Sequence, residues 1–189
     1  MAESHITKQA IVACMKQLMQ EKSFDKITIA DITKSCGLNR QTFYYHFQDK
    51  YELIHWIFYN EVILVLTKDL SLESWPENLC EMLTVMYNQK GFYKNAMKSS
   101  FQEDFHTYLF EISTSLFTSI FEHLAINNKV QKEDLLFLAR FFSYGVVGAI
   151  LSWINEGMNQ SPNSMKNQIV ALVDDCKNYA AKRYMEEHI

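Results

Sequence analysis

The sequence predicts an all-α protein, because residues that break helices are scarce and apolar residues recur at helical spacing. Only 5 glycines and 2 prolines occur among the 189 residues. No stretch shows the strict alternation of apolar and polar residues that marks a half-buried strand. Hydrophobic residues make up 48% of the chain and aromatic residues 14%, which is enough for a substantial core.

The first two helices are predicted from their end signals. Ser4 is a suitable N-cap, and apolar residues at helical spacing continue from it to about Glu21. Thr28 is the N-cap of a short second helix, which carries Ile32 on its inner face. Gly37 follows as the residue that most easily adopts the left-handed backbone at the end of a helix.

Two further helices follow within the first seventy residues. Asn39 caps the third helix, and Leu38 before the cap pairs with Phe43 four positions after it in a hydrophobic staple. Asp49, with Glu52 three positions later, starts a fourth helix. Its apolar pattern continues to about position 70, which corresponds to roughly 30 Å at about 1.5 Å per residue.

The rest of the chain predicts a helical body. Breaks rich in Gly, Asn, Ser and Pro separate the expected helices, which lie at about 77–89, 92–99, 103–126, 132–157 and 163–186. Because the boundary falls inside the fourth helix, we divide the chain into a three-helix domain at 1–50 and a helical domain at 51–189. The two domains then share an element and are not joined by a flexible linker.

Several classes of protein are excluded by the sequence. The four cysteines are scattered without the paired spacing of zinc ligands, so we expect reduced thiols in the cytoplasm, no metal and no cofactor. Nothing resembles a signal peptide, and we expect no membrane association because no uninterrupted apolar run approaches a membrane span. No catalytic triad, phosphate-binding glycine loop or HExxH motif occurs, so we expect no enzyme.

Charge is distributed unevenly along the chain. Residues 1–60 carry seven basic and six acidic side chains, whereas the remainder carries 11 basic and 16 acidic ones. This near-neutral first part and acidic remainder predict only modest electrostatic attraction to nucleic acid. Any phosphate binding would therefore depend on geometry and on helix N-termini.

The third predicted helix presents a polar face opposite its buried one. Phe43 and Phe47 face inward, so Arg40, Gln41 and Tyr44 share the other side. Arg and Gln form bidentate hydrogen bonds with guanine and adenine edges in the major groove, and Tyr can contact a phosphate or a thymine methyl group. The alternative is an ordinary solvated helix, although neighbouring exposed aromatics are unusual there. The pattern predicts a helix-turn-helix DNA reader.

Residues around this helix are expected at the DNA backbone. Tyr45, His46 and Lys50 lie further along the chain, where they would meet phosphates while Arg40 meets bases. Thr28 places a hydroxyl and free backbone amides at a helix N-terminus, which suits a phosphate group. For His46 the alternative is an ordinary, partly buried histidine.

The N-terminal part resembles the TetR family of bacterial transcription regulators. The resemblance rests on TIADI at 28–32, CGLN at 36–39, TFYYHF at 42–47 and DKYEL at 49–53. It implies that the third helix is the recognition helix, with base contacts at Asn39, Arg40 and Gln41. The family often has a small residue where Gln41 stands, so this position departs from the usual pattern. Together with Thr42, the predicted DNA-binding residues are Thr28, Asn39, Arg40, Gln41, Thr42, Tyr44, Tyr45, His46 and Lys50.

The last two helices predict a homodimer. Small residues line one stripe of the helix at 132–157, the last helix carries an apolar stripe, and in TetR-like proteins these two helices pair with their twins. The expected interface residues are Tyr144, Gly145, Gly148, Ser152, Ile169, Leu172 and Cys176. The alternative is that the stripes face the protomer's own core. Independently, a two-fold dimer on a palindromic double-stranded operator doubles the few base contacts of one short helix.

The body is rich in Met and aromatic residues, which suits a pocket for a flat or apolar effector. The expected pocket residues are Tyr59, Met86, Tyr93, Met97 and Phe117, with an ordinary core as the alternative. Segments 91–97 and 144–158 resemble the subgroup that includes dihydroxyacetone-kinase regulators. We expect a repressor controlled by an unknown small-molecule effector. The alternative is the same DNA reader acting as an activator under a protein co-regulator.

A di-iron oxidase is the competing reading from a different class. The pairs Glu52/His55 and Glu103/His106 have the Glu-x-x-His spacing of di-iron helical bundles, and Glu81 and Glu122 could complete the ligand set. Against this reading, Glu52 falls in the first turn of a helix, where an acid favours the helix dipole and faces water.

Overall fold

The computed structural model describes the backbone of residues 2–71, 73–99, 101–124 and 131–186. It describes the side chains, and how far each is buried, for residues 5–71, 73–99, 101–123 and 131–175. Every regular element in these ranges is helical, which confirms the predicted fold class. The elements are α1 (Ala2–Glu21), η1 (Phe24–Lys26), α2 (Ile29–Cys36), α3 (Arg40–His46), α4 (Lys50–Phe58), η2 (Tyr59–Ile63), α5 (Leu64–Thr67), α6 (Trp75–Asn88), α7 (Lys90–Ala96), α8 (Gln102–Leu124), α9 (Lys132–Asn155) and α10 (Pro162–Glu186).

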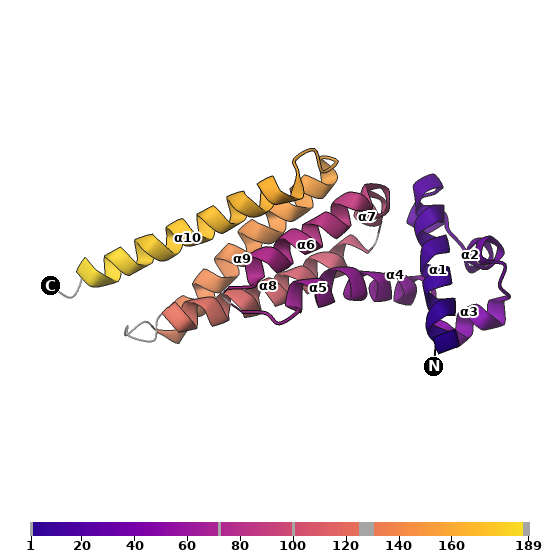
Figure 1. Ribbon diagram of the computed structural model, residues 1–189, viewed down its shortest axis with the longest axis horizontal. Helices are drawn as coiled ribbons and strands as arrows, with labels where there is room; N and C mark the ends of the chain where they lie inside the picture. The colour runs from indigo at the N-terminus through magenta and orange to yellow at the C-terminus, as the bar shows by residue number, and fades with distance from the viewer. Residues whose placement is uncertain (1, 72, 100, 125–130, 187–189) are drawn as a thin grey trace.

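The molecule is elongated, with a small helical head at one end (Figure 1). We call residues 2–49, which contain α1 to α3, the head, and residues 64–186 the body. The segment α4 leads from the head into the body, and α10 runs along the outside of the other long helices (Figure 1). The short helices that are predicted to meet DNA therefore lie at the far end from the C-terminus of α10.

The helix ends in the head follow from local hydrogen bonds. The Thr28 hydroxyl accepts from the Asp31 amide while the Asp31 carboxylate accepts from the Thr28 amide, a reciprocal capping box. Gly37 ends α2 with a φ of 67°, in the left-handed region that favours glycine. Asn39 Oδ1 accepts from the Thr42 amide at 2.7 Å and so caps α3. The predicted caps of α2 and α3 are confirmed.

The segments α4, η2 and α5 follow one another without a break from Lys50 to Thr67. Asp49 Oδ1 accepts from the amides of Tyr51 and Glu52, which confirms the predicted start. The middle segment η2 is a π-helix, a widened turn that sequence periodicity did not predict. The long connecting helix is thus present, with a change of winding between the head and the body.

The body packs its helices pairwise. The helices α8 and α9 pack along one another, and α10 packs on α6. One face of α9 is buried in this core through Ala139, Ser143, Val147 and Ile150. The other face of α9 is exposed and apolar, and α9 is long and apolar enough to cross a membrane by length and composition alone. Arg140 interrupts its apolar residues, and the core helices of soluble proteins also have this length and composition, so α9 by itself is weak evidence for a membrane span.

Candidate nucleic-acid interface

One side of the helix α3 packs on the core of the head, and its opposite side is exposed. The side chains of Phe43 and Phe47 are buried, with ring centroids 5.9 Å apart. Because α3 has only seven residues, these two rings hold both of its turns. Arg40 and Gln41 are exposed on the side away from this core. The helix therefore presents polar side chains from a rigid base.

Two adjacent tyrosines extend this exposed side. Tyr44 is 55% exposed and Tyr45 is 80% exposed. The Tyr44 ring meets Phe43 edge-on at 5.7 Å, and the Tyr45 ring meets the half-buried His46 edge-on at 5.0 Å. Each tyrosine ring thus contacts one neighbouring ring while much of the side chain is exposed, an arrangement that suits contact with a sugar–phosphate backbone.

The N-terminus of α2 carries a compact charged group. The Lys22 ammonium bonds Asp31 at 2.9 Å and lowers the pKa of this carboxyl to about 2, with help from the amide and hydroxyl of Thr28. The Thr28 hydroxyl donates to Asp31, so its single hydrogen is already used. The Thr28 hydroxyl can still accept a hydrogen bond but has no hydrogen left to donate to a phosphate. A phosphate would therefore have to bind the backbone amides that follow Thr28 at the start of α2.

Lys50 is placed differently from the expected phosphate contact. Its ammonium donates to the carbonyl oxygens of Phe24, Asp25 and Ile27, each at 2.9 Å. It also lies 4.7 Å from the centroid of the Phe24 ring. An ammonium group has three hydrogens, so a phosphate contact would have to break one of these bonds. The geometry makes Lys50 a support of the η1 turn.

Asn39 and Thr42 also have local roles. The Asn39 amide oxygen accepts from both the amide and the hydroxyl of Thr42. Asn39 is exposed, and Thr42 is half-buried. The structure therefore brings Asn39, Arg40 and Gln41 to the open end of α3 but turns the Thr42 hydroxyl back toward the cap.

The expected dimer residues divide between two environments. Tyr144, Gly145, Gly148 and Ser152 are exposed along α9, and a Cβ added to either glycine would meet no atom within 4 Å. Leu172 is 59% exposed on α10. Cys176 lies outside the residues whose side chains are described.

Ile169 is a correction to the expected dimer surface. It is only 6% exposed and belongs to the protomer's own core, where α10 packs on α6. Ile169 and Leu172 both belong to the apolar stripe of the last helix and lie on neighbouring positions of its surface, but Ile169 is buried in the core whereas Leu172 is 59% exposed. The interface prediction therefore fails at Ile169.

Four of the five expected effector residues are buried in the core, and the fifth is exposed. Met86, Tyr93, Met97 and Phe117 are packed core residues, each at most 2% exposed. The hollow that Phe117 lines is only about 20 Å³. Tyr59 is exposed and lines a different hollow of about 240 Å³ with Trp56 and Tyr108. For four of the five residues, the alternative of an ordinary core describes the structure better.

The di-iron reading finds no site in the described part of the chain, where no three His, Cys, Asp or Glu side chains gather as a metal-binding set. The Glu52 carboxylate accepts a hydrogen bond from the Gln48 amide. His55 Nε2 lies 3.3 Å from Asp104 Oδ2, so it pairs with the neighbour of Glu103.

Two family models match the chain. The model for bacterial regulatory proteins of the tetR family matches residues 11–57, and a model for a transcriptional regulator C-terminal region matches residues 73–175. The HTH-type dhaKLM operon transcriptional activator DhaS of Lactococcus lactis subsp. lactis (strain IL1403) is 32% identical over 94 residues. That match spans 50% of this chain and 50% of the relative.

Solved structures show the same fold. The dihydroxyacetone kinase operon activator DhaS has a TM-score of 0.75 at 23% identity, over 92% of this chain and 97% of that chain. A transcriptional regulator from Aquifex aeolicus VF5 has a TM-score of 0.63 at 21% identity, over 89% and 98%. The fatty acid degradation regulator FadR from Bacillus halodurans has a TM-score of 0.61 at 12% identity, over 88% and 93%.

Proposed function

This chain belongs to the tetR family of bacterial regulatory proteins, and from that premise we propose that it binds a palindromic operator as a homodimer in the cytoplasm. The observation that carries the proposal is the rigid presentation of α3. Buried Phe43 and Phe47 hold the helix, and Arg40 and Gln41 stand exposed on its outer side.

We assign the base contacts to residues at the start of α3. Arg40 and Gln41 carry the two side chains that pair bidentately with guanine and adenine edges. Asn39 lies beside them, and its amide oxygen is used in the cap of α3. A helix of seven residues spans only about 10 Å at about 1.5 Å per residue, so it can cover only a few base pairs. A second copy of α3 is needed for useful specificity.

We assign the contacts with the DNA backbone to residues at the C-terminal part of α3. Tyr44 and Tyr45 can donate their hydroxyls to phosphates, and His46 lies next to them. The amides at the start of α2, next to Thr28, offer a second contact point. Lys50 holds η1 through its three hydrogen bonds, and we assign it this supporting role in place of a phosphate contact.

The exposed apolar face of α9 is the proposed dimer surface. Phe137, Phe141 and Tyr144 follow one another at helical spacing and are each at least 60% exposed. Gly145 and Gly148 leave open space beside them, where a second helix can approach closely. Burial of large aromatic side chains is strongly favourable, so a second copy of this face is a suitable cover. On α10, the exposed Leu172 is the residue that we assign to the same interface.

We propose that the protein activates transcription, by analogy with a relative, and not that it represses transcription as the sequence suggested. DhaS is named as a transcriptional activator, which favours activation over the repression that we expected. For control, the body offers a groove of about 730 Å³ between α8 and α9, lined in part by His106, Phe110 and Arg140. A small-molecule effector or a protein co-regulator could each use this groove or the hollow beside Tyr59.

Selection of bound sites from random duplex DNA tests the proposal. The expected product is a palindrome with two half-sites whose centres lie about 34–36 Å apart, one helical turn. The Arg40→Ala variant should recover sites that have lost preference at one symmetric position. Enrichment of no sequence at low salt by the wild-type protein would refute the proposed function.

A further inference from the structure

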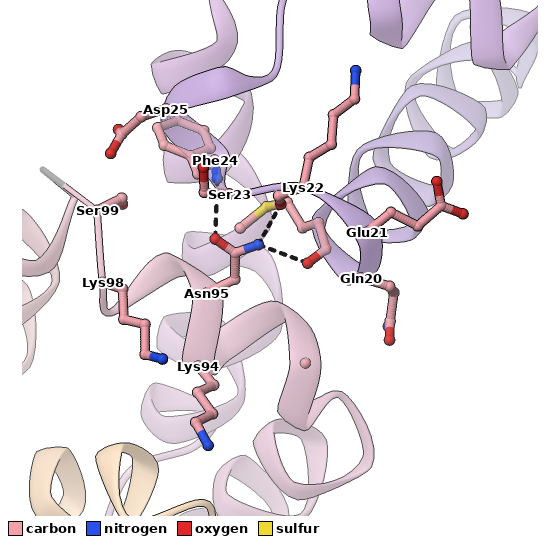
Figure 2. Close-up of a pocket in the computed structure, with 12 residues that line it drawn as sticks. Gln20, Glu21, Lys22, Ser23, Phe24, Asp25, Lys94, Asn95, Lys98 and Ser99 are labelled. Atoms are coloured by element: carbon pink, nitrogen blue, oxygen red, sulfur yellow. Dashed lines mark hydrogen bonds between the residues drawn. The ribbon is translucent and has the colours of Figure 1, made fainter.

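One body residue bonds the backbone of the head at three points. Figure 2 shows Asn95 of α7 reaching toward the end of α1 and the start of η1. Its amide nitrogen donates to the carbonyl oxygens of Met19 at 2.7 Å and Lys22 at 2.6 Å. Its amide oxygen accepts from the Phe24 amide at 3.0 Å. Backbone groups at the end of a helix lack partners within it, so Asn95 caps α1 from another part of the fold.

The same turn is held from its other side. Lys50 donates to the carbonyls of Phe24, Asp25 and Ile27. The turn η1 is therefore bonded to the body through Asn95 and to the start of α4 through Lys50. Thr28, the cap of α2, directly follows Ile27, the C-cap of η1, so η1 leads straight into the DNA-reading motif. A displacement of η1 relative to the body would therefore move the head as one unit, with the arrangement of α2 and α3 within it unchanged.

The helix α7 is itself firmly seated in the body. Phe92 and Tyr93 are buried, and the Lys90 ammonium donates to the Met158 carbonyl at 2.8 Å. At Gly91 a Cβ would come 2.9 Å from the end of the Gln20 side chain, so α7 and α1 lie close together. Asn95 thus projects from a fixed helix onto the head.

A second polar contact joins the head to the body nearby. Lys16 of α1 forms an ion pair with Glu61 in the π-segment η2. Gln89, between α6 and α7, donates to the other oxygen of the same carboxylate at 3.1 Å. The head is therefore tied to the body directly at Asn95 and, through Glu61 of the connecting segment, at Gln89, in addition to its covalent link through α4.

We propose that Asn95 is a positioning residue that fixes the head on the body and thereby sets the half-site spacing that the dimer accepts. The proposal rests on the proposed function, because spacing has meaning only for a dimer on DNA. Without Asn95, the covalent link through α4, the Lys16–Glu61 contact and the packing of α1 against α7 remain, but the three bonds that orient η1 on the body are lost. The head can then rotate, and two recognition helices on one dimer reach a wider range of separations.

The test compares palindromes that differ only in the number of base pairs between their half-sites. Wild-type protein should bind its best spacer roughly tenfold or more tightly than spacers that differ by one or two base pairs, since each base pair changes both distance and rotation. Asn95→Leu, which keeps a side chain branched at the same carbon but makes no hydrogen bond, should bind these duplexes with affinities within about threefold of one another. Its affinity for a single half-site should equal that of the wild type.

Matched variants separate positioning from folding. Asn88→Leu places the same side chain at an exposed position of α6 and should keep the wild-type spacer preference. Asn95→Ser retains a hydroxyl that can replace one bond, and its preference should be intermediate. If Asn95→Leu fails to fold, as judged by its thermal unfolding, Asn95→Ser carries the test.

The outcomes are distinguishable. An unchanged spacer preference in folded Asn95→Leu would overturn the positioning role. A uniform loss on every duplex, half-site included, would also overturn it, because that result indicates a merely structural role. Failure of wild-type protein to bind any duplex would instead refute the proposed function and, with it, this inference.

Discussion

Replacement of Lys50 by methionine separates two roles for this side chain, phosphate contact and support of η1. Methionine keeps an unbranched apolar stem beside the Phe24 and Tyr51 rings, over which the ammonium lies at 4.7 and 5.5 Å. It removes all three hydrogen bonds to the η1 carbonyls. The variant therefore tests the ammonium group and not the packing of the side chain.

The magnitude follows from those three bonds. A hydrogen bond to a charged group contributes about 1.5–3 kcal/mol. The three are not additive, and Lys50 is only half-buried, so water can replace part of what is lost. We expect the free energy of unfolding to fall by about 2–4 kcal/mol, given these bonds and their partial replacement.

Two assays decide between the roles. Denaturant unfolding followed by circular dichroism measures the stability change, and DNA binding at several salt concentrations measures the number of phosphate contacts. Loss of one phosphate contact lowers the slope of log affinity against log salt by about 0.9. We expect reduced stability and an unchanged slope. A lower slope with unchanged stability would refute the support role and restore the phosphate contact.

Three further predictions follow from the site, the cap of α2 and the dimer surface. Arg40→Ala should weaken binding to the selected operator by about 1–3 kcal/mol and relax the base preference at one symmetric position. Competition with base-substituted duplexes measures both effects, and an equal loss of affinity on every duplex would show that Arg40 does not read bases. Because the folded pKa of Asp31 is lowered from 3.8 to about 2, its stabilising effect is complete above pH 4 and is lost as pH falls toward 2. The stability difference between wild type and Asp31→Asn should therefore shrink over that window in acid unfolding; a constant difference would contradict the lowered pKa. Phe141→Glu places a charge at a position that is 65% exposed in one protomer, and the variant should be monomeric in analytical ultracentrifugation. The control variant Glu111→Gln, at another exposed position, should remain dimeric. A dimeric Phe141→Glu variant would show that the interface lies elsewhere.

Local features of the fold could be predicted from the sequence because their partners lie within a few residues. Thr28, Asn39 and Asp49 each cap a helix through amides two or three positions later. Gly37 ends α2 in the left-handed conformation. The outward face of α3 followed from the same periodicity, since Phe43 and Phe47 identify its buried side.

Features that depend on distant contacts could not be predicted. The partners of Lys50 lie 23 to 26 positions away, so its charge suggested a phosphate contact although its hydrogens are used within the head. Asn95 bonds residues 71 to 76 positions away, and nothing in its local sequence marks it. Ile169 and Leu172 belong to one apolar stripe, and only the packing of α6 decides which of them is covered.

The central claim is that the outer side of α3 contacts duplex DNA. A photoreactive amino acid placed at Gln41, which is exposed on α3, tests this contact directly when the protein is irradiated with a selected duplex. The same amino acid at the exposed Gln168 of α10 serves as the control. We predict crosslinking from position 41 and none from position 168. Crosslinking from α10 with none from α3 would contradict the account.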